Sequence, residues 1–352
     1  MNLQIEQFNM NQNIFTSFNQ TENFVCLGTN YGFYVFLVNP FRKVISREIE
    51  GGVSLVKMLY DTNIFLFVGR TDTGPYPNNK LIIWDDNKRI VLSEITYYDR
   101  IINIDITKQH VIVCIKDKIF IYDFQSLEVI KAIETNNHKG LMYVGHQDIE
   151  FVAYPGENIG YINVYRIGND NIETFQAHTN PIDNIYVSSN GNFIVTASEK
   201  GTIIRIFDSS NFIKINEFRR GSEQTSIKNI SMNKNNSILL VSSEKGTIHL
   251  FNTDIDKNFL FKNKGFNNYG MNYIKFALPE YFSSEWSFAQ FHLKNILSNS
   301  CFDKETFRIF SICNDGQFYI LNFENEKQTI EKTIKYISDS SDPFDDRETT
   351  IK

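Results

Sequence analysis

Two adjacent arginines in Phe218-Arg219-Arg220-Gly221 are the strongest candidates for binding chemistry in this sequence. Consecutive side chains of an extended segment point in opposite directions, so Arg219 and Arg220 should not serve one ligand together. An arginine fork pairs with two oxygens of a phosphate group, and hydroxyls and open backbone amides at a glycine turn complete such a site. The pair therefore predicts two separate pockets for a phosphorylated polyol.

The residues that could complete these pockets occur in two similar segments, one before and one after the arginine pair. Both segments contain the run Ser-Glu-Lys-Gly-Thr, and the two glycines of this run are Gly201 and Gly246. We expect Arg219 to turn towards the first segment and Arg220 towards the second. The first segment offers Thr196, Ser198, Lys200, Thr202, Arg205 and the amides around Gly201, and the second offers Ser243, Lys245, Thr247 and His249.

A plainer interpretation stays open at this point. The repeated run is also a favourable turn between two strands, in which Ser and Thr cap backbone groups. The two arginines would then be solvated or would pair with Glu217 or Glu223. The residues alone do not decide between a pair of binding pockets and a pair of structural turns.

Catalytic chemistry finds no support in the sequence. It has no nucleophile elbow, no Walker loop, no dinucleotide fingerprint and no zinc-protease motif. The six histidines stand alone, and the four cysteines are scattered without paired spacing, so we expect no enzymatic activity, no metal, no cofactor and reduced, mostly buried thiols. The net charge of −6 argues against a nucleic-acid partner and requires a local patch for any anionic ligand.

The elements that must position the arginines form a repeat. An apolar strand, a turn and a second strand recur along the chain, and aromatic residues reach 14%. Five of the six spacings between equivalent turns lie between 38 and 47 residues, which matches the four-stranded blades of WD-type propellers. The seven equivalent turns lie at Gly32, Asn79, Asp117, Gly160, Gly201, Gly246 and Gly316. We predict an all-β, seven-bladed β-propeller of WD-repeat type as a single domain over 1–338, followed by an acidic, disordered tail over 339–352.

One interval is longer than the others, because Gly246 and Gly316 lie 70 positions apart. The excess forms an apolar segment over about 252–286, which we expect to be a loop of the sixth blade, either functional or folded back as a lid. No run of about 20 apolar residues exists, and Met1 to Glu6 lack a signal pattern, so we expect a soluble intracellular protein.

The motif Phe-Arg-Arg-Gly, flanked by the two Ser-Glu-Lys-Gly-Thr segments, resembles the PROPPIN family of WD-repeat propellers that bind polyphosphoinositides, which includes the WIPI proteins. Further short motifs that are similar to those of the family occur over most of the chain. Among them, Ile82-Ile83-Trp84-Asp85-Asp86 is similar to the sequence in the branch with the third and fourth WIPI proteins. The other motifs are Asn39-Pro40-Phe41, Glu50-Gly51-Gly52, Lys139-Gly140-Leu141, Tyr154-Pro155-Gly156 and Ala177-His178.

The resemblance implies a set of site residues. The first lipid site would use His178, Thr196, Ser198, Gly201, Thr202, Arg205 and Arg219, and the second Arg220, Gly221, Ser243, Thr247 and His249. The long segment would insert into the membrane through Phe259, Leu260, Phe261, Phe266, Tyr273, Ile274 and Phe276.

The resemblance also implies a role: a membrane-recruited adaptor that binds phosphatidylinositol 3-phosphate and the 3,5-bisphosphate in autophagy and related traffic. Its partner would be a lipid-transfer or conjugation-machinery protein of autophagy. It would be a monomer in solution, cytoplasmic, and peripheral on pre-autophagosomal, endosomal or vacuolar membranes. A protein-interaction scaffold without lipid binding is the alternative.

Overall fold

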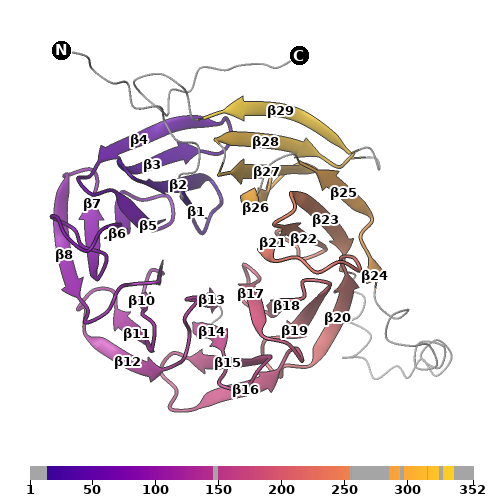
Figure 1. Cartoon of the computed structure of the whole chain (residues 1–352), viewed down its shortest axis with the longest axis horizontal. Helices are drawn as coiled ribbons and strands as arrows, with labels where there is room; N and C mark the ends of the chain where they lie inside the picture. Colours follow the sequence, from indigo (N-terminus) through magenta and orange to yellow (C-terminus); the bar gives the residue numbers. More distant parts are fainter. Residues whose placement is uncertain are drawn as a thin grey trace.

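The computed structural model describes residues 14–145, 150–253, 255, 285–293, 297–314, 316–324 and 328–336. These residues form seven sheets arranged in a ring, each with four antiparallel strands, and the fifth sheet has one additional short parallel strand; this confirms the predicted propeller (Figure 1). In the order of the chain, the first three blades are β1 (Phe15–Phe18), β2 (Phe24–Thr29), β3 (Gly32–Leu37), β4 (Arg42–Glu48); β5 (Val53–Met58), β6 (Ile64–Gly69), β7 (Lys80–Asp85), β8 (Ile90–Thr96); and β9 (Asn103–Ile106), β10 (His110–Cys114), β11 (Lys118–Asp123), β12 (Val129–Glu134).

The remaining four blades follow the same plan. They comprise β13 (Tyr143–Gly145), β14 (Phe151–Pro155), β15 (Tyr161–Arg166), β16 (Ile172–Gln176); β17 (Ile182–Val187), β18 (Phe193–Ser198), β19 (Ile203–Asp208), β20 (Lys214–Arg219); β21 (Ile227–Met232), β22 (Ile238–Ser243), β23 (Thr247–Asn252), β25 (Ala289–His292); and β26 (Leu297–Phe302), β27 (Arg308–Cys313), β28 (Gln317–Asn322), β29 (Thr329–Lys335).

Burial along the strands follows from their place in the blade. Strand β18 lies inside the fifth blade and all six of its residues are buried, whereas the outer strands β4 and β8 alternate between exposed and half-buried residues. A strand whose two faces are both covered by neighbouring blades has a continuous run of buried residues. In an outer strand, every second side chain points towards solvent. The four cysteines are free and buried, as the sequence predicts.

The seven predicted turns all join the second and third strands of a blade. At Gly201 the backbone has φ +60°, and a Cβ there would lie 1.8 Å from the carbonyl oxygen of Thr225. Only glycine fits such a turn without moving the backbone of the next connection. The glycine in the Ser-Glu-Lys-Gly-Thr run is therefore required by the fold as well as being available to a ligand.

The ring closes by packing between complete blades, because β1 and β29 each belong to their own four-stranded sheet. Phe41 of the first blade stacks on Phe318 of the seventh, with ring centroids 3.8 Å apart. Amides near the axis link other neighbours: Asn184 Nδ2 donates to the carbonyl of Ile227, and Asn229 Nδ2 donates to Asn299 Oδ1 at 2.8 Å.

The long interval lies between β23 and β25, the third and fourth strands of the sixth blade. Residues 254 and 256–284 are outside the described part, and so are Phe259, Leu260, Phe261, Phe266, Tyr273, Ile274 and Phe276 and the tail over 339–352. The end of the interval is described: β24 (Glu285–Trp286) pairs in parallel with β20, with Trp286 opposite Arg219. No helix among the described residues has the length and apolarity needed to cross a bilayer.

Candidate functional site

The register of the fifth blade places several predicted residues on one of its faces. Thr196 of β18 pairs with Arg205 of β19, which pairs with Glu217 of β20. Ser198 and Arg219 lie two positions along their strands from Thr196 and Glu217, so they share this face. The same face carries Ile194 and Phe207, which pack against apolar residues of the fourth blade. The residues predicted for the first site therefore line the crevice between blades four and five.

Hydrogen bonds fix two of these side chains in place. His178 Nε2 lies 3.0 Å from Thr196 Oγ1. Arg205 donates from Nε to Glu217 Oε2 at 2.8 Å and from Nη1 to the carbonyl of Ala177 at 2.7 Å. Lys214 also donates to Glu217 Oε2, at 2.9 Å. The side chains of the first site are thus held by hydrogen bonds to residues of the fifth blade and of the connection that leads into it.

The electrostatics of the first site favour neutral histidine and ionised glutamate. Burial, together with the charge of Arg205, lowers the pKa of His178 to about 4. Hydrogen bonds and charges from Lys214 and Arg205 outweigh the desolvation of Glu217, so the pKa of its carboxyl falls to about 2. At neutral pH, therefore, His178 offers one donor and one acceptor without adding charge.

Arg220 lies on the opposite side of the strand and turns towards the sixth blade. Its Nε donates to the carbonyl of Gly201 at 2.7 Å, and its Nη2 donates to the carbonyl of Glu223. Its own amide donates to the carbonyl of Thr202 at 2.9 Å. Both arginines are buried, with 9% of Arg219 and 8% of Arg220 exposed. Arg220 thus bonds to the backbone at the Gly201 turn and in the connection to the sixth blade, while the strand register places Arg219 on the face that carries Thr196. A separate ligand pocket for each arginine stays a prediction.

The residues predicted for the second site lie on the face of the sixth blade that packs against the fifth. Ser243 Oγ and Thr247 Oγ1 are 2.7 Å apart, and Ser243 is fully buried. Burial, together with the nearby Arg220 and His292, lowers the pKa of His249 to about 4. A Cβ at Gly221 would meet nothing within 4 Å, so no steric demand explains glycine there.

Sequence reasoning missed one contributor to the second site. His249 Nδ1 lies 3.2 Å from Ser287 Oγ, which also accepts a hydrogen bond from Gln290 Nε2 at 2.8 Å. Ser287 lies just after the long interval, 38 positions from His249. No local motif could connect two residues at that separation. Their proximity follows from β25 returning to pair with β23.

The described residues include no group of three or more His, Cys, Asp or Glu side chains that could hold a metal ion. The groups present in the two crevices are arginines, hydroxyls, neutral imidazoles and the backbone of glycine turns. Such a set binds phosphate oxygens through charge-assisted hydrogen bonds.

Comparison with known proteins decides the family. The PROPPIN family model matches residues 13–287. The chain belongs to the PROPPIN family. It is 36% identical over 283 residues to autophagy-related protein 18e of Arabidopsis thaliana, which covers 79% of this chain and 74% of that protein. In two other curated relatives the match spans only 59% of their length.

Solved PROPPIN structures have the same fold. Kluyveromyces lactis Hsv2 with its complete loop 6CD has a TM-score of 0.76 and 24% identity, over 92% of this chain and 98% of that one. KlAtg21 in complex with the coiled coil of AgAtg16 has a TM-score of 0.72 and 22% identity, over 91% of this chain and 98% of that one. Membership of the PROPPIN family places the chain among the phosphoinositide-binding adaptors of autophagy.

Proposed function

We propose that this PROPPIN docks on membranes by holding one phosphoinositide headgroup with Arg219 and a second with Arg220. The observation that carries the proposal is the division of the two arginines between neighbouring crevices, each supplied with hydroxyls, a neutral histidine and a glycine turn. Phosphatidylinositol 3-phosphate and the 3,5-bisphosphate are the proposed ligands, since each presents compact phosphate groups to an arginine fork.

The proposed sites comprise His178, Thr196, Ser198, Gly201, Thr202, Arg205 and Arg219 in the first crevice, and Arg220, Gly221, Ser243, Thr247 and His249 in the second. Gly201 links them, because its carbonyl accepts from Arg220 while its turn borders the first crevice. A headgroup in the second crevice would have to compete with the carbonyls of Gly201 and Glu223 for the Arg220 guanidinium.

The segment over 252–286 is proposed as a second membrane anchor. Stable peripheral binding generally needs two signals, and one buried Phe or Leu side chain contributes roughly 1.5 to 3 kcal/mol. At the C-terminal end of the segment, β24 pairs with the outer strand of the fifth blade and Trp286 is 54% exposed, which supports the proposal, whereas Thr253 and Ile255 at the other end are buried.

The proposed role is recruitment of autophagy machinery to pre-autophagosomal, endosomal or vacuolar membranes. KlAtg21, a structural neighbour, forms a complex with the coiled coil of AgAtg16, which supports a conjugation-machinery partner for this chain. A lipid-transfer protein of autophagy is the other proposed partner. The protein is proposed to be a cytoplasmic monomer that acts as an adaptor and not as an enzyme.

Vesicle flotation tests the lipid-binding proposal. The wild-type chain should float with vesicles that contain phosphatidylinositol 3-phosphate and stay in solution with phosphatidylcholine vesicles alone. The double variant Arg219→Thr/Arg220→Thr should stay in solution in both cases. Arg42→Thr, an exposed arginine of β4, is the matched control and should float like the wild type.

One observation favours the alternative of a protein-interaction scaffold. Arg205 is already paired with Glu217, and Arg220 with two backbone carbonyls, so both have structural partners in the described residues. A scaffold whose arginines are purely structural would remain in solution with either type of vesicle. It would also lose thermal stability in the double variant.

A further inference from the structure

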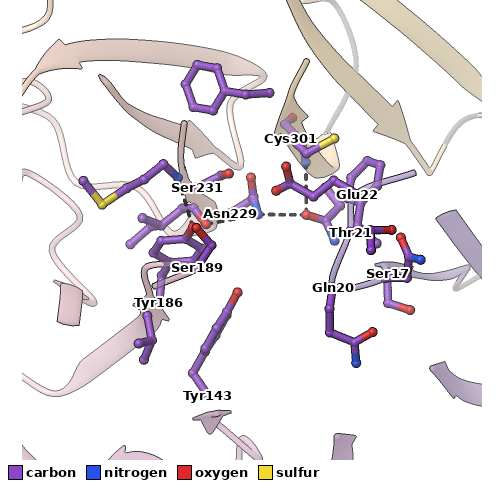
Figure 2. Close-up of a pocket in the computed structure, with 18 of the residues that line it drawn as sticks. Ser17, Gln20, Thr21, Glu22, Tyr143, Tyr186, Ser189, Asn229, Ser231 and Cys301 are labelled. Carbon is purple, nitrogen blue, oxygen red and sulfur yellow. Dashed lines mark hydrogen bonds between the residues drawn. The ribbon is translucent and has the colours of Figure 1, made fainter. Parts of the chain in front are cut away.

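A cavity of about 670 Å³ lies on the axis of the propeller, away from both proposed headgroup sites. Its walls come from the innermost strand of every blade, β1, β5, β9, β13, β17, β21 and β26, and from the segments that follow β1, β5, β17, β21 and β26. Figure 2 shows Glu22, Tyr143 and Tyr186 reaching towards one space from the first, fourth and fifth blades. None of the twelve residues proposed for headgroup binding lines this cavity.

The cavity presents hydrogen-bond acceptors that lack donors. The Glu22 carboxylate makes no hydrogen bond or ion pair with any described residue, and Asp105, also in the lining, makes no ion pair within the described part of the chain. Asn229 uses its Nδ2 to donate to Asn299, and its Oδ1 is buried without a partner among the described residues. The buried Oδ1 of Asn229 and the half-buried carboxylate of Glu22 can each accept a further hydrogen bond, whereas Asp105 Oδ1 already accepts one from the Ile106 amide at 2.9 Å.

The nearby lysines leave Glu22 without a counter-ion. Lys304 Nζ donates to Asn23 Oδ1 at 2.8 Å, and neither Lys57 nor Lys234, which also line the cavity, forms an ion pair with Glu22 in the described structure. Burial raises the pKa of the Glu22 carboxyl to about 7, and Lys304 offsets only part of the rise. A carboxylate in such surroundings is costly unless a cation neutralises it.

The wall beside Glu22 is aromatic. The rings of Tyr143 and Tyr186 meet edge to face, with centroids 5.1 Å apart. Tyrosine faces attract cations, and the attraction grows where water is excluded. A primary ammonium group carries three donors and no acceptor, which complements a surplus of acceptors. An anionic ligand could pair with Lys57, Lys234 or Lys304 of the same lining, but it would leave the Glu22 carboxylate without a counter-ion.

We propose that the axial cavity binds a primary alkylammonium group, with the Glu22 carboxylate as counter-ion and Tyr143 and Tyr186 as the aromatic wall. Two sources carry this chemistry: the side chain of a lysine in a partner protein, and a free polyamine. The site is independent of Arg219 and Arg220, so vesicle binding can fail while ammonium binding holds, and the reverse.

Isothermal titration calorimetry with the full chain at pH 8 tests the proposal. The probes are 1,4-diaminobutane and an end-blocked Gly-Lys-Gly peptide, and the control is the same peptide with its lysine acetylated. At least one amine probe should bind saturably and the acetylated peptide should not. Binding of the peptide alone points to a protein partner, and binding of the diamine alone to a free polyamine. If neither amine binds, or if acetylation makes no difference, the proposal is wrong.

Variants locate the bound cation. Glu22→Gln should weaken binding about tenfold or more, because a hydrogen bond to a charged group is lost. Tyr143→Phe keeps the ring and should cost a few-fold at most. Asp303→Asn is the matched control, since this carboxylate lines the same cavity but already accepts a hydrogen bond from Thr306, and it should bind within about twofold of the wild type. Unchanged binding by Glu22→Gln would overturn the proposal.

The pH profile gives a readout that does not depend on any variant folding. The affinity of the wild type should rise between pH 6 and 8 as Glu22 loses its proton. The charged groups that line the same cavity are Asp105, Asp303, Lys57, Lys234 and Lys304. Tyr60, Tyr143, Tyr186 and Cys301 stay neutral over this range because burial raises their pKa values. A flat wild-type profile, or the same rise in Glu22→Gln, would contradict the assignment.

Discussion

The two proposed headgroup sites use similar residues but are assembled differently. The first is braced by a carboxylate in its own blade, since Glu217 holds both Arg205 and Lys214. The second has no such carboxylate in contact with its arginine side chain: Arg220 bonds to backbone carbonyls, and His249 contacts Ser287, which follows the long interval. Similar sequence can therefore give one site organised locally and one that depends on a distant segment.

The membrane segment should produce the largest effect. Replacing Phe259, Leu260 and Phe261 with Ser should sharply reduce binding to phosphoinositide vesicles, because each lost apolar side chain removes roughly 1.5 to 3 kcal/mol of membrane burial. Affinity for a soluble inositol headgroup should be nearly unchanged at both sites, as measured by calorimetry. A parallel fall in headgroup affinity, or a loss of thermal stability, would mean that the segment is a structural lid. A fall in headgroup affinity at the second site alone would mean that this site depends on further residues of the segment besides Ser287.

The single arginine variants separate the two sites. Arg219→Thr and Arg220→Thr should each reduce vesicle binding in part and lower the stoichiometry for a soluble headgroup from two to one. Each guanidinium contributes charge-assisted bonds to one crevice only. Complete loss of headgroup binding in either single variant would show that the crevices are not independent.

Removing the Glu217 carboxylate tests whether the first site depends on a carboxylate of its own blade. Glu217→Gln should lower the free energy of unfolding by about 1 to 2 kcal/mol, because two charge-assisted hydrogen bonds are weakened in a half-buried setting. The folded pKa of about 2 lies below the unfolded value of 4.5, so the stability that Glu217 contributes is present above pH 4.5 and is lost as the pH falls towards 2. Denaturant unfolding at pH 7 and pH 3 checks both points, since the difference from wild type should shrink at the lower pH.

The corresponding change at the second site should be smaller. Ser287→Ala removes one hydrogen bond of 3.2 Å to His249, so the expected loss of stability is about 0.5 to 1 kcal/mol. Headgroup binding at the first site should not change. An effect on stability as large as that of Glu217→Gln would remove the contrast between the two sites.

The histidines give the finest comparison. The pKa values of His178 and His249 are both lowered from 6.5 to about 4, so their stability contributions are present above pH 6.5 and are lost as the pH falls through 4. In Arg220→Thr the pKa of His249 should rise while that of His178 stays in place, because Arg220 lies beside His249 only. Titration of the imidazole signals by NMR checks this. Equal changes in the pKa values of both histidines would mean that the charge of Arg220 acts on both crevices.

The fold was largely predictable because its signals are local and repeated. Each blade contributes a glycine, aspartate or asparagine turn between two apolar strands, so the number of blades follows from counting these turns. The placement of Arg219 on the same strand face as Glu217 was also predictable, because alternation is a property of any extended strand. The interval between Gly246 and Gly316 marked the blade with the extra segment.

Other features depend on residues that only the folded ring brings together. Sequence could offer Glu217 as a partner for an arginine, but the choice of Arg205 follows from the register of β19 and β20. The pairing of β24 with β20 and the contact of Ser287 with His249 arise where a long interval returns to the sheet. The axial cavity needs several blades at once, since Glu22, Tyr143 and Tyr186 stand in three of them. The sequence determined the repeat and the side chains each blade could offer; closure of the ring decided which of those side chains meet, because contacts between blades join positions that no local pattern relates.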